Sequence, residues 1–350
     1  MEAIAYKKDI RKLSLEEIKG FLAEQGEKPF RAQQIYEWLW KKSTHSFDEM
    51  SNLSLKTRKL LKNHFEIKNI HLAQQQVSAD KTIKYAFELA DQNHIEGVLI
   101  PTDQRMTACV SSQVGCSLTC KFCATGYMER KRNLDPGEIY DQVVLLNQAA
   151  LAHYQTPLSN IVFMGMGEPL LNYQNVLQAI EHITSPEGLH MASKRITVST
   201  AGIAKMIKKL GDDAVKFNLA LSLHAANDQK RSQIMPINDH NNLPVLQEAL
   251  NYFYHKTKNK ITFEYIVFHN FNDSLKDAEE LYAFSRKVPA KINLIEYNPI
   301  REAAFKNTQE DKLGAFANYL QEKGLIVNVR RSRGKDIDAA CGQLAIKQKE

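Results

Sequence analysis

The feature that most constrains the chain is a group of three cysteines in residues 116–123, which read CSLTCKFC. Cys116, Cys120 and Cys123 lie on one short segment with no fourth cysteine beside them. A structural zinc site takes four ligands, and an electron-carrying iron–sulfur cluster is usually held by four cysteine thiolates. Three thiolates around a [4Fe–4S] cluster leave one iron without a protein ligand. The spacing therefore predicts a metal cluster with an open position at which chemistry can occur.

The pattern Cys-x3-Cys-x2-Cys, with Phe122 just before the last cysteine, resembles the motif of the radical S-adenosylmethionine (SAM) enzymes. The resemblance implies that the open iron of the [4Fe–4S] cluster binds the amino and carboxylate groups of SAM. One electron from the cluster then cleaves SAM and yields a 5′-deoxyadenosyl radical. The motif says little about the substrate, which has to be inferred from the rest of the chain.

Composition narrows the class of protein. A chain of 350 residues can form one large domain and a smaller accessory one, and 43% hydrophobic with 25% charged residues is typical of soluble globular proteins. We find no long apolar run and no secretory signal pattern, so we expect no membrane segment and a cytoplasmic location. The net charge of +6 is compatible with a polyanionic partner.

Residues 1–92 are predicted to form a mostly helical, RNA-binding accessory domain that ends in a small β element. After Ser54, a predicted helix carries a basic cluster with few acids, namely Lys56, Arg58, Lys59 and Lys62. Such a cluster is either a solvated helix face or a contact for RNA phosphates. The second interpretation is favoured by aromatic residues that we expect to be exposed near Lys41 and Lys42. These are Tyr36, Trp38 and Trp40.

From residue 93 to 350 the pattern changes to alternating strands and helices. Strands are predicted at 107–111, 160–164, 195–199, 217–223, 261–268, 291–296 and 325–331. Helices are predicted at 136–152, 173–184, 202–210, 245–254, 275–288 and 309–323. This alternation predicts an α/β fold with parallel strands, and the resemblance narrows it to the partial (βα)6 barrel of radical SAM enzymes. In barrels, reactive groups gather at the carboxyl ends of the strands.

Polar residues occur where the predicted strands end. Residues 164–169 read MGMGEP, similar to the "GGE" segment of the superfamily, which implies that Gly167 and Glu168 bind the amino group of SAM. A single Ser, Asn or His at such a position is usually a turn or otherwise satisfied residue. Their recurrence after three further strands predicts additional contacts with SAM. The residues concerned are Ser199, Ser222, Leu223, His224 and Asn298.

Several motifs together are similar to the RlmN family of RNA adenine-C2 methyltransferases. They are 109–116 (CVSSQVGC), 165–170 (GMGEPL), 221–224 (LSLH), 235–238 (MPIN), 330–334 (RRSRG) and 338–344 (DAACGQL). The resemblance spans nearly the whole chain. It implies methylation of C2 of one adenosine in the peptidyl-transferase region of 23S rRNA, and of the adenosine next to the anticodon in tRNA. We also expect a monomer that takes electrons from a reductant such as flavodoxin.

The resemblance gives roles to the two remaining cysteines. Cys341 would accept a methyl group from a first SAM, and the radical from a second SAM would take a hydrogen atom from that S-methyl group. The methylene radical would add to C2 of the adenine. Cys109 would then attack the Cys341 sulfur and release the RNA, leaving a disulfide, while Glu96 would remove the C2 proton. Without the resemblance, each cysteine is a small buried hydrophobe and Glu96 a solvent-facing carboxylate.

Asn270 stands where the family commonly has Gly, and Asn tolerates positive φ, so we expect the turn to form as in the family.

Three alternative functions remain open. A relative of the family methylates C8 of the same adenosine with the same cysteines, but often carries Ala where this chain has Pro169. A radical SAM maturase or cyclase usually needs cysteines for further clusters, and only Cys109 and Cys341 are spare. A zinc-stabilised RNA-binding protein would contain zinc in place of iron.

Overall fold

A computed structural model describes residues 7–346. The N-terminal unit consists of the helices α1 (Leu15–Glu24), α2 (Arg31–Trp40) and α3 (Leu55–His64), with a short parallel pair, β1 (Lys8–Asp9) and β2 (Phe65–Glu66). Helix α1 begins at Ser14 because the side chains of Ser14 and Glu17 each accept a hydrogen bond from the other's backbone N–H. Helix α3 begins at Ser54, whose side chain accepts from the N–H of Thr57.

The basic cluster of α3 is partly used within the protein. Arg58 donates hydrogen bonds to the carbonyl oxygens of Leu53, Asp48 and Ser51, so its charge stabilises the loop before α3. Lys62 pairs with Asp48 at 2.5 Å. Lys56 remains 85% exposed, and Lys59 is exposed as well.

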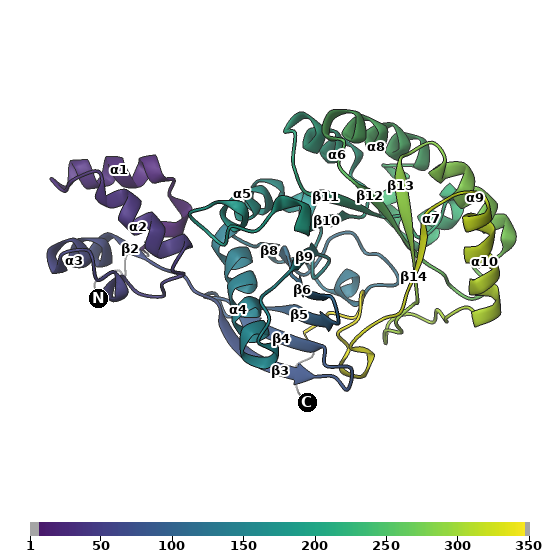
Figure 1. Cartoon of the computed structure of the whole chain (residues 1–350), viewed down its shortest axis with the longest axis horizontal. Coiled ribbons are helices and arrows are strands. Elements are labelled where there is room, and N and C mark those ends of the chain that lie inside the picture. Colours follow the sequence, from purple (N-terminus) through teal and green to yellow (C-terminus); the bar gives the residue numbers. More distant parts are fainter. Residues whose placement is uncertain (1–6, 347–350) are drawn as a thin grey trace.

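Trp40 is 1% exposed, so the prediction that it lies on the surface is wrong. Its ring stacks on His182 of the main domain, with centroids 3.6 Å apart, and its carbonyl oxygen accepts a hydrogen bond from Tyr140. Beside this contact Arg11 pairs with Asp141 at 2.7 Å. The N-terminal unit is thus held against α4 (Pro136–Tyr154) and α5 (Tyr173–Thr184) by buried contacts (Figure 1).

The main domain is built on seven parallel strands, which confirms the predicted α/β fold. Their order is β6-β9-β10-β11-β12-β13-β14. They are β6 (Arg105–Cys109), β9 (Asn160–Phe163), β10 (Ile196–Thr200), β11 (Asn218–Ser222), β12 (Ile261–Ile266), β13 (Ala290–Ile295) and β14 (Val327–Arg330).

Six predicted helices connect these strands and cover the outside of the curved sheet (Figure 1). Besides α4 and α5 they are α6 (Ala204–Asp212), α8 (Leu243–Thr257), α9 (Leu275–Ser285) and α10 (Glu310–Glu322). A short helix, α7 (Asp228–Ile234), was not predicted. No helix within residues 7–346 is both long and apolar enough to cross a membrane.

Three antiparallel strands extend the sheet beyond β6. They are β5 (His94–Thr102), β4 (Ile83–Glu88) and β3 (His71–Val77), so β3 and β14 form the two edges of one ten-stranded sheet. Residues 71–88, which lie within the predicted accessory domain, are therefore hydrogen-bonded to the sheet of the main domain. The functional division at residue 92 stays a prediction.

The stacking of Trp40 predicts how the N-terminal unit is stabilised. Replacing Trp40 by Ala should lower the free energy of unfolding by about 3–5 kcal/mol, because a fully buried ring is lost. Trp38, on the same helix, is partly exposed and donates to Asn52 at 2.6 Å; Trp38→Ala should cost less than about half as much. Chemical denaturation measures both. Equal losses would show that docking does not depend on Trp40.

Candidate active site

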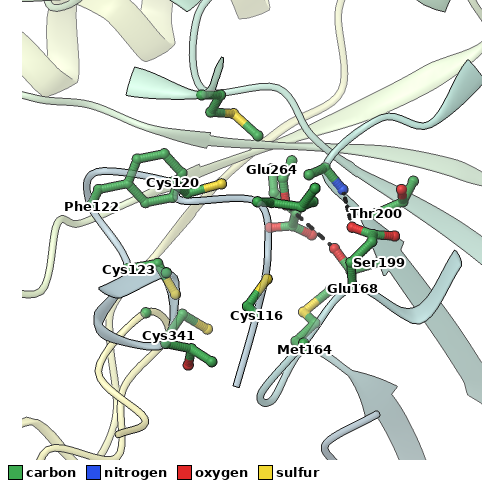
Figure 2. Close-up of a pocket in the computed structure, with 18 of the residues that line it drawn as sticks. Cys116, Cys120, Phe122, Cys123, Met164, Glu168, Ser199, Thr200, Glu264 and Cys341 are labelled. Carbon is green, nitrogen blue, oxygen red and sulfur yellow. Dashed lines mark hydrogen bonds between the residues drawn. The ribbon is translucent and has the colours of Figure 1, made fainter. Parts of the chain in front are cut away.

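One cavity opens at the carboxyl ends of the strands, with an empty volume of about 930 Å³ that includes its open mouth. This volume is within the usual range of ligand pockets. Nine of the predicted site residues line it, drawn from the loop after β6, the ends of β9, β10 and β11, and the C-terminal segment (Figure 2). These are Cys116, Cys120, Cys123, Gly167, Glu168, Ser199, Ser222, His224 and Cys341.

The three clustered cysteines lie on one wall of the cavity (Figure 2). Burial raises the pKa of Cys116 to about 11, and it also raises the pKa values of Cys120 and Cys123. Their loop is held by Lys121, whose N–H donates to the Ile234 carbonyl at 3.0 Å. Within residues 7–346, no three His, Cys, Asp or Glu side chains are gathered as ligands of a single metal ion.

The donor set fits a larger cationic core. Three half-buried thiols in one cavity become thiolates only when positive charge compensates for their desolvation and mutual repulsion. A [4Fe–4S] core bound by Cys116, Cys120 and Cys123 would supply that charge. The buried guanidinium of Arg231 adds to it, because its positive charge lowers the pKa of Cys120 against the effect of burial.

Glu168 lies on the opposite wall of the cavity (Figure 2), where two backbone N–H groups hold its carboxylate. Its two carboxylate oxygens accept hydrogen bonds from the N–H groups of Leu170, at 3.0 Å, and Ala201, at 2.8 Å. Burial nevertheless raises its pKa to about 7. Gly167 has φ +93°, and a Cβ there would lie 2.4 Å from the Cβ of Gln113, so this glycine is required by close packing as well as by the strand end.

His224 presents a defined tautomer to the cavity. The N–H of Ile266 donates to Nδ1 at 3.1 Å, so Nδ1 carries no proton and Nε2–H is the donor of the neutral ring. Burial, together with the charge of Arg231, lowers the pKa of His224 to about 3. The preceding Leu223 is fully buried behind the wall, and Ser199 and Ser222 approach each other, with their hydroxyl oxygens 3.5 Å apart.

Arg231 on α7 supports this wall and was not predicted from the sequence. Its guanidinium donates to the carbonyl oxygens of Ala201 at 2.6 Å, Leu223 at 3.2 Å and Ser222 at 3.2 Å, and to Asn238 at 2.9 Å. The side chain is fully buried, and burial lowers its pKa to about 10. Its position shortly before the MPIN motif is the one sequence signal that could have pointed to it.

Cys341 and Asn298 lie beside the cluster cysteines. The Asn298 side chain donates to the Cys341 carbonyl oxygen at 3.1 Å, while its own buried Oδ1 has no hydrogen-bond partner. Asn298 is not among the residues that line the cavity, but an unpartnered buried acceptor next to Cys341 fits a hydrogen bond from a bound ligand. The carbonyl oxygen of Gly342 accepts from the N–H of Ala124 at 2.7 Å, so the segment that carries Cys341 rests on residues 116–125, which we call the cluster loop.

Cys109 and Glu96 lie behind the cavity wall, on the inner face of the sheet. Cys109 pairs with Val98 on β5, and since side chains alternate along a strand, Glu96 and Val98 share that face. Cys109 is 6% exposed, and burial, followed by the nearby Cys341, raises its pKa. Glu96 is 4% exposed and pairs with Lys84 at 3.5 Å, so the expectation of a solvent-facing carboxylate is wrong.

Two further polar residues shape the site. Glu264 lines the cavity from β12, accepts a hydrogen bond from Asn293 at 2.8 Å and lies 3.7 Å from Arg330. Asn272 is fully buried, and its side chain donates to the carbonyl oxygens of His224 and Ile266. The preceding turn survives as expected, because Asn270 has φ 54°.

This fold and cavity define the class of protein. Residues 110–284 match the family model of the radical SAM superfamily, and residues 8–67 match the ribosomal RNA large subunit methyltransferase N-terminal domain. The crystal structure of a radical SAM methyltransferase from Sphaerobacter thermophilus is similar, with a TM-score of 0.90 and 37% identity, covering 96% of this chain and 99% of that one. The protein is a radical SAM methyltransferase.

Relatives identify the family. A protein of Cytophaga hutchinsonii named "Probable dual-specificity RNA methyltransferase RlmN" is 67% identical over 98% of this chain and 94% of its own length. That of Bacillus anthracis is 42% identical over 98% of this chain and 95% of its own. The chain belongs to the RlmN family of RNA methyltransferases, which confirms the resemblance found in the sequence.

Proposed function

We propose that the protein methylates C2 of an adenosine in 23S rRNA, and of the adenosine next to the anticodon in tRNA, through an S-methylcysteine at Cys341. The observation that carries the proposal is the position of Cys341, which shares one cavity with Cys116, Cys120 and Cys123. A methyl carrier must meet both the methyl donor and the radical source, and this cavity offers one place for both.

In the proposed reaction, different residues of the cavity bind the cluster and SAM. Cys116, Cys120 and Cys123 would hold the [4Fe–4S] cluster, which with SAM supplies a carbon radical. Glu168 would bind the SAM ammonium, while His224 Nε2–H and Asn298 Oδ1 offer a hydrogen-bond donor and an acceptor to the rest of SAM. Ser199, Ser222, Gly167 and the backbone at Leu223 would complete the pocket.

The inner sheet face supports the later steps. Cys109 is near enough to Cys341 for the charge of a Cys341 thiolate to raise the pKa of Cys109, which supports the proposed pairing of the two sulfurs. Glu96 pairs with the ammonium group of Lys84 and would act as the base that removes the C2 proton. The N-terminal unit would add phosphate contacts through Lys56 and Lys59, and the electrons would come from a reductant such as flavodoxin.

The metal content separates this function from a zinc-stabilised RNA-binding protein. After anaerobic reconstitution the wild type should hold about four irons per chain. Cys116→Ala, Cys120→Ala or Cys123→Ala should each abolish the cluster, whereas the control Cys109→Ala should keep it. Iron and zinc are measured by mass spectrometry and visible absorption. Full iron in any of the three variants, or zinc in the wild type, would refute the cluster assignment.

Glu168 predicts a pH dependence of SAM binding. Its pKa is raised to about 7, so below pH 7 the carboxyl is neutral and must lose a proton before it can pair with an ammonium. SAM affinity should therefore fall by up to about tenfold per pH unit from pH 7 to 5.5. Glu168→Gln should bind weakly with a nearly flat profile in equilibrium dialysis. A change of less than about threefold at pH 7.5 would argue that Glu168 is only structural.

Two cysteine variants and methyl mapping test the function itself. Cys341→Ala should deliver no methyl to RNA. Cys109→Ala should accumulate a covalent protein–RNA adduct, visible as a slow, nuclease-sensitive band, because nothing releases the product. Mass spectrometry of wild-type products should place the methyl on C2. A methyl on C8 would make the chain the C8-directed relative, and normal turnover by Cys109→Ala would refute the disulfide step.

A further inference from the structure

The segment that carries Cys341 crosses the gap between the two edges of the sheet. We call residues 331–344 the strap. It begins after the edge strand β14, where Arg331 and Lys335 pair with Glu296 at 2.6 and 2.5 Å. It then reaches the turn between β3 and β4 at the opposite edge, and Figure 1 shows its yellow trace running from β14 toward those strands.

The contact with the β3–β4 turn is reciprocal. Asp80 of the turn accepts a hydrogen bond from the N–H of Gly334 at 2.9 Å. Asp336 of the strap accepts from the hydroxyl of Ser78 at 2.5 Å and from the N–H of Ala79 at 3.0 Å. Each carboxylate thus binds backbone of the other segment, and charged acceptors make the stronger kind of hydrogen bond.

Two further contacts fit the strap to the turn. Gly334 has φ +67°, and a Cβ there would lie 2.7 Å from the Cβ of Ala339 and 3.0 Å from Thr82. Arg333 donates to the Pro101 carbonyl oxygen at 2.8 Å and lies 3.6 Å from Asp80. The strap therefore lies against the edge of the sheet in one defined position.

The same edge leads to the inner face on which Glu96 lies. Lys84 on β4 is buried and donates to the carbonyl oxygen of Asp338 at 3.4 Å, while its ammonium pairs with Glu96 at 3.5 Å. Asp338 precedes Cys341 by three residues, which span at most about 10 Å. Beyond Cys341, the strap rests on the cluster loop through Gly342 and Leu344.

We propose that Asp80 and Asp336 are positioning residues. Their hydrogen bonds between the strap and the β3–β4 turn, which we call the clasp, set where Cys341 lies relative to the cavity, Cys109 and Glu96. The proposal rests on the proposed function, in which Cys341 has to present its methyl group to the radical and its sulfur to Cys109. The strap is bound to the β3–β4 turn before Cys341 and to the cluster loop after it, so Cys341 can move only a short distance over the cavity.

Amide exchange tests the clasp itself, without any cofactor. In the cluster-free full chain, Asp80→Ala/Asp336→Ala should speed deuterium exchange of residues 331–344 by about tenfold or more, and leave β10 to β12 unchanged. The double Asn variant keeps carbonyl acceptors and should lie between it and the wild type. The matched control is Asp103→Ala, an exposed acid in the turn between β5 and β6, which should match the wild type. Unchanged exchange in the double Ala variant would overturn the clasp.

The coupling between SAM cleavage and methyl transfer to RNA tests whether the clasp positions Cys341. In reconstituted enzyme the double Ala variant should still cleave SAM, because the clasp does not touch the cluster loop. The ratio of 5′-deoxyadenosine formed to methyl delivered to RNA should rise at least about threefold, because the radical no longer meets a positioned S-methyl group. A merely destabilising change would lower both amounts together, and an unchanged ratio would refute the inference.

The two proposals fail differently. If wild-type Cys341 never carries a methyl group, the proposed function is wrong, whatever the exchange experiment shows. If wild-type Cys341 is methylated and the double Ala variant stays as tightly coupled as the wild type, the positioning role alone is wrong.

Discussion

The buried guanidinium of Arg231 ties together the strand ends on which the cavity is built. It donates to three carbonyl oxygens that follow or end β10 and β11. Burying a cation is costly unless its donors are satisfied, and here hydrogen bonds to carbonyl groups and Asn238 occupy them. The residues it holds are direct neighbours of the site: the N–H of Ala201 binds Glu168, and Leu223 precedes His224. One side chain outside the cavity thus fixes two of its walls, and its charge also acts on the cysteine loop.

The open sheet creates a second constraint. A closed barrel pairs its first and last strands and fills its interior with packed side chains, whereas here β3 and β14 are separate edges. The inner face accommodates polar pairs such as Lys84 with Glu96 and Arg330 with Glu264. The gap is bridged by the strap, which is held by side-chain hydrogen bonds rather than by a strand ladder. A bridge of this kind can carry a thiol that has to reach several partners, because fewer bonds have to break when it moves.

Much of this architecture could be predicted from the sequence, because parallel strands and amphipathic helices leave strong periodic signals. The parallel strands were found within a few residues, as was α5, and the cysteine loop and the polar strand ends do meet in one cavity. Strand β3 escaped prediction because both of its faces are exposed, so its sequence HLAQQQV has no alternating pattern. Helix α7 is short and buries only Arg231 and Ile234, which leaves no helical stripe to detect. The burial of Trp40 depends on His182, far away in the sequence, and that of Glu96 on Lys84 of the neighbouring strand. Periodic patterns carry no information about such pairs.

The electrostatics of the cavity bear on the order of events in the proposed reaction. A thiol accepts a methyl group only as a thiolate, yet desolvation of the sulfur raises the pKa of Cys341, although the residue as a whole is exposed. Arg330 acts in the opposite direction and favours the thiolate of Cys341, while Glu264, paired with that arginine, disfavours it. Arg330 also favours the thiolate of Cys109, so a single cation on the last strand acts on both cysteines of the proposed disulfide. Bound SAM carries a positive sulfonium, and a positive charge in this cavity lowers the pKa of a neighbouring thiol further. In the proposed reaction, the Cys341 thiolate would therefore form most readily when SAM, its methyl donor, is bound.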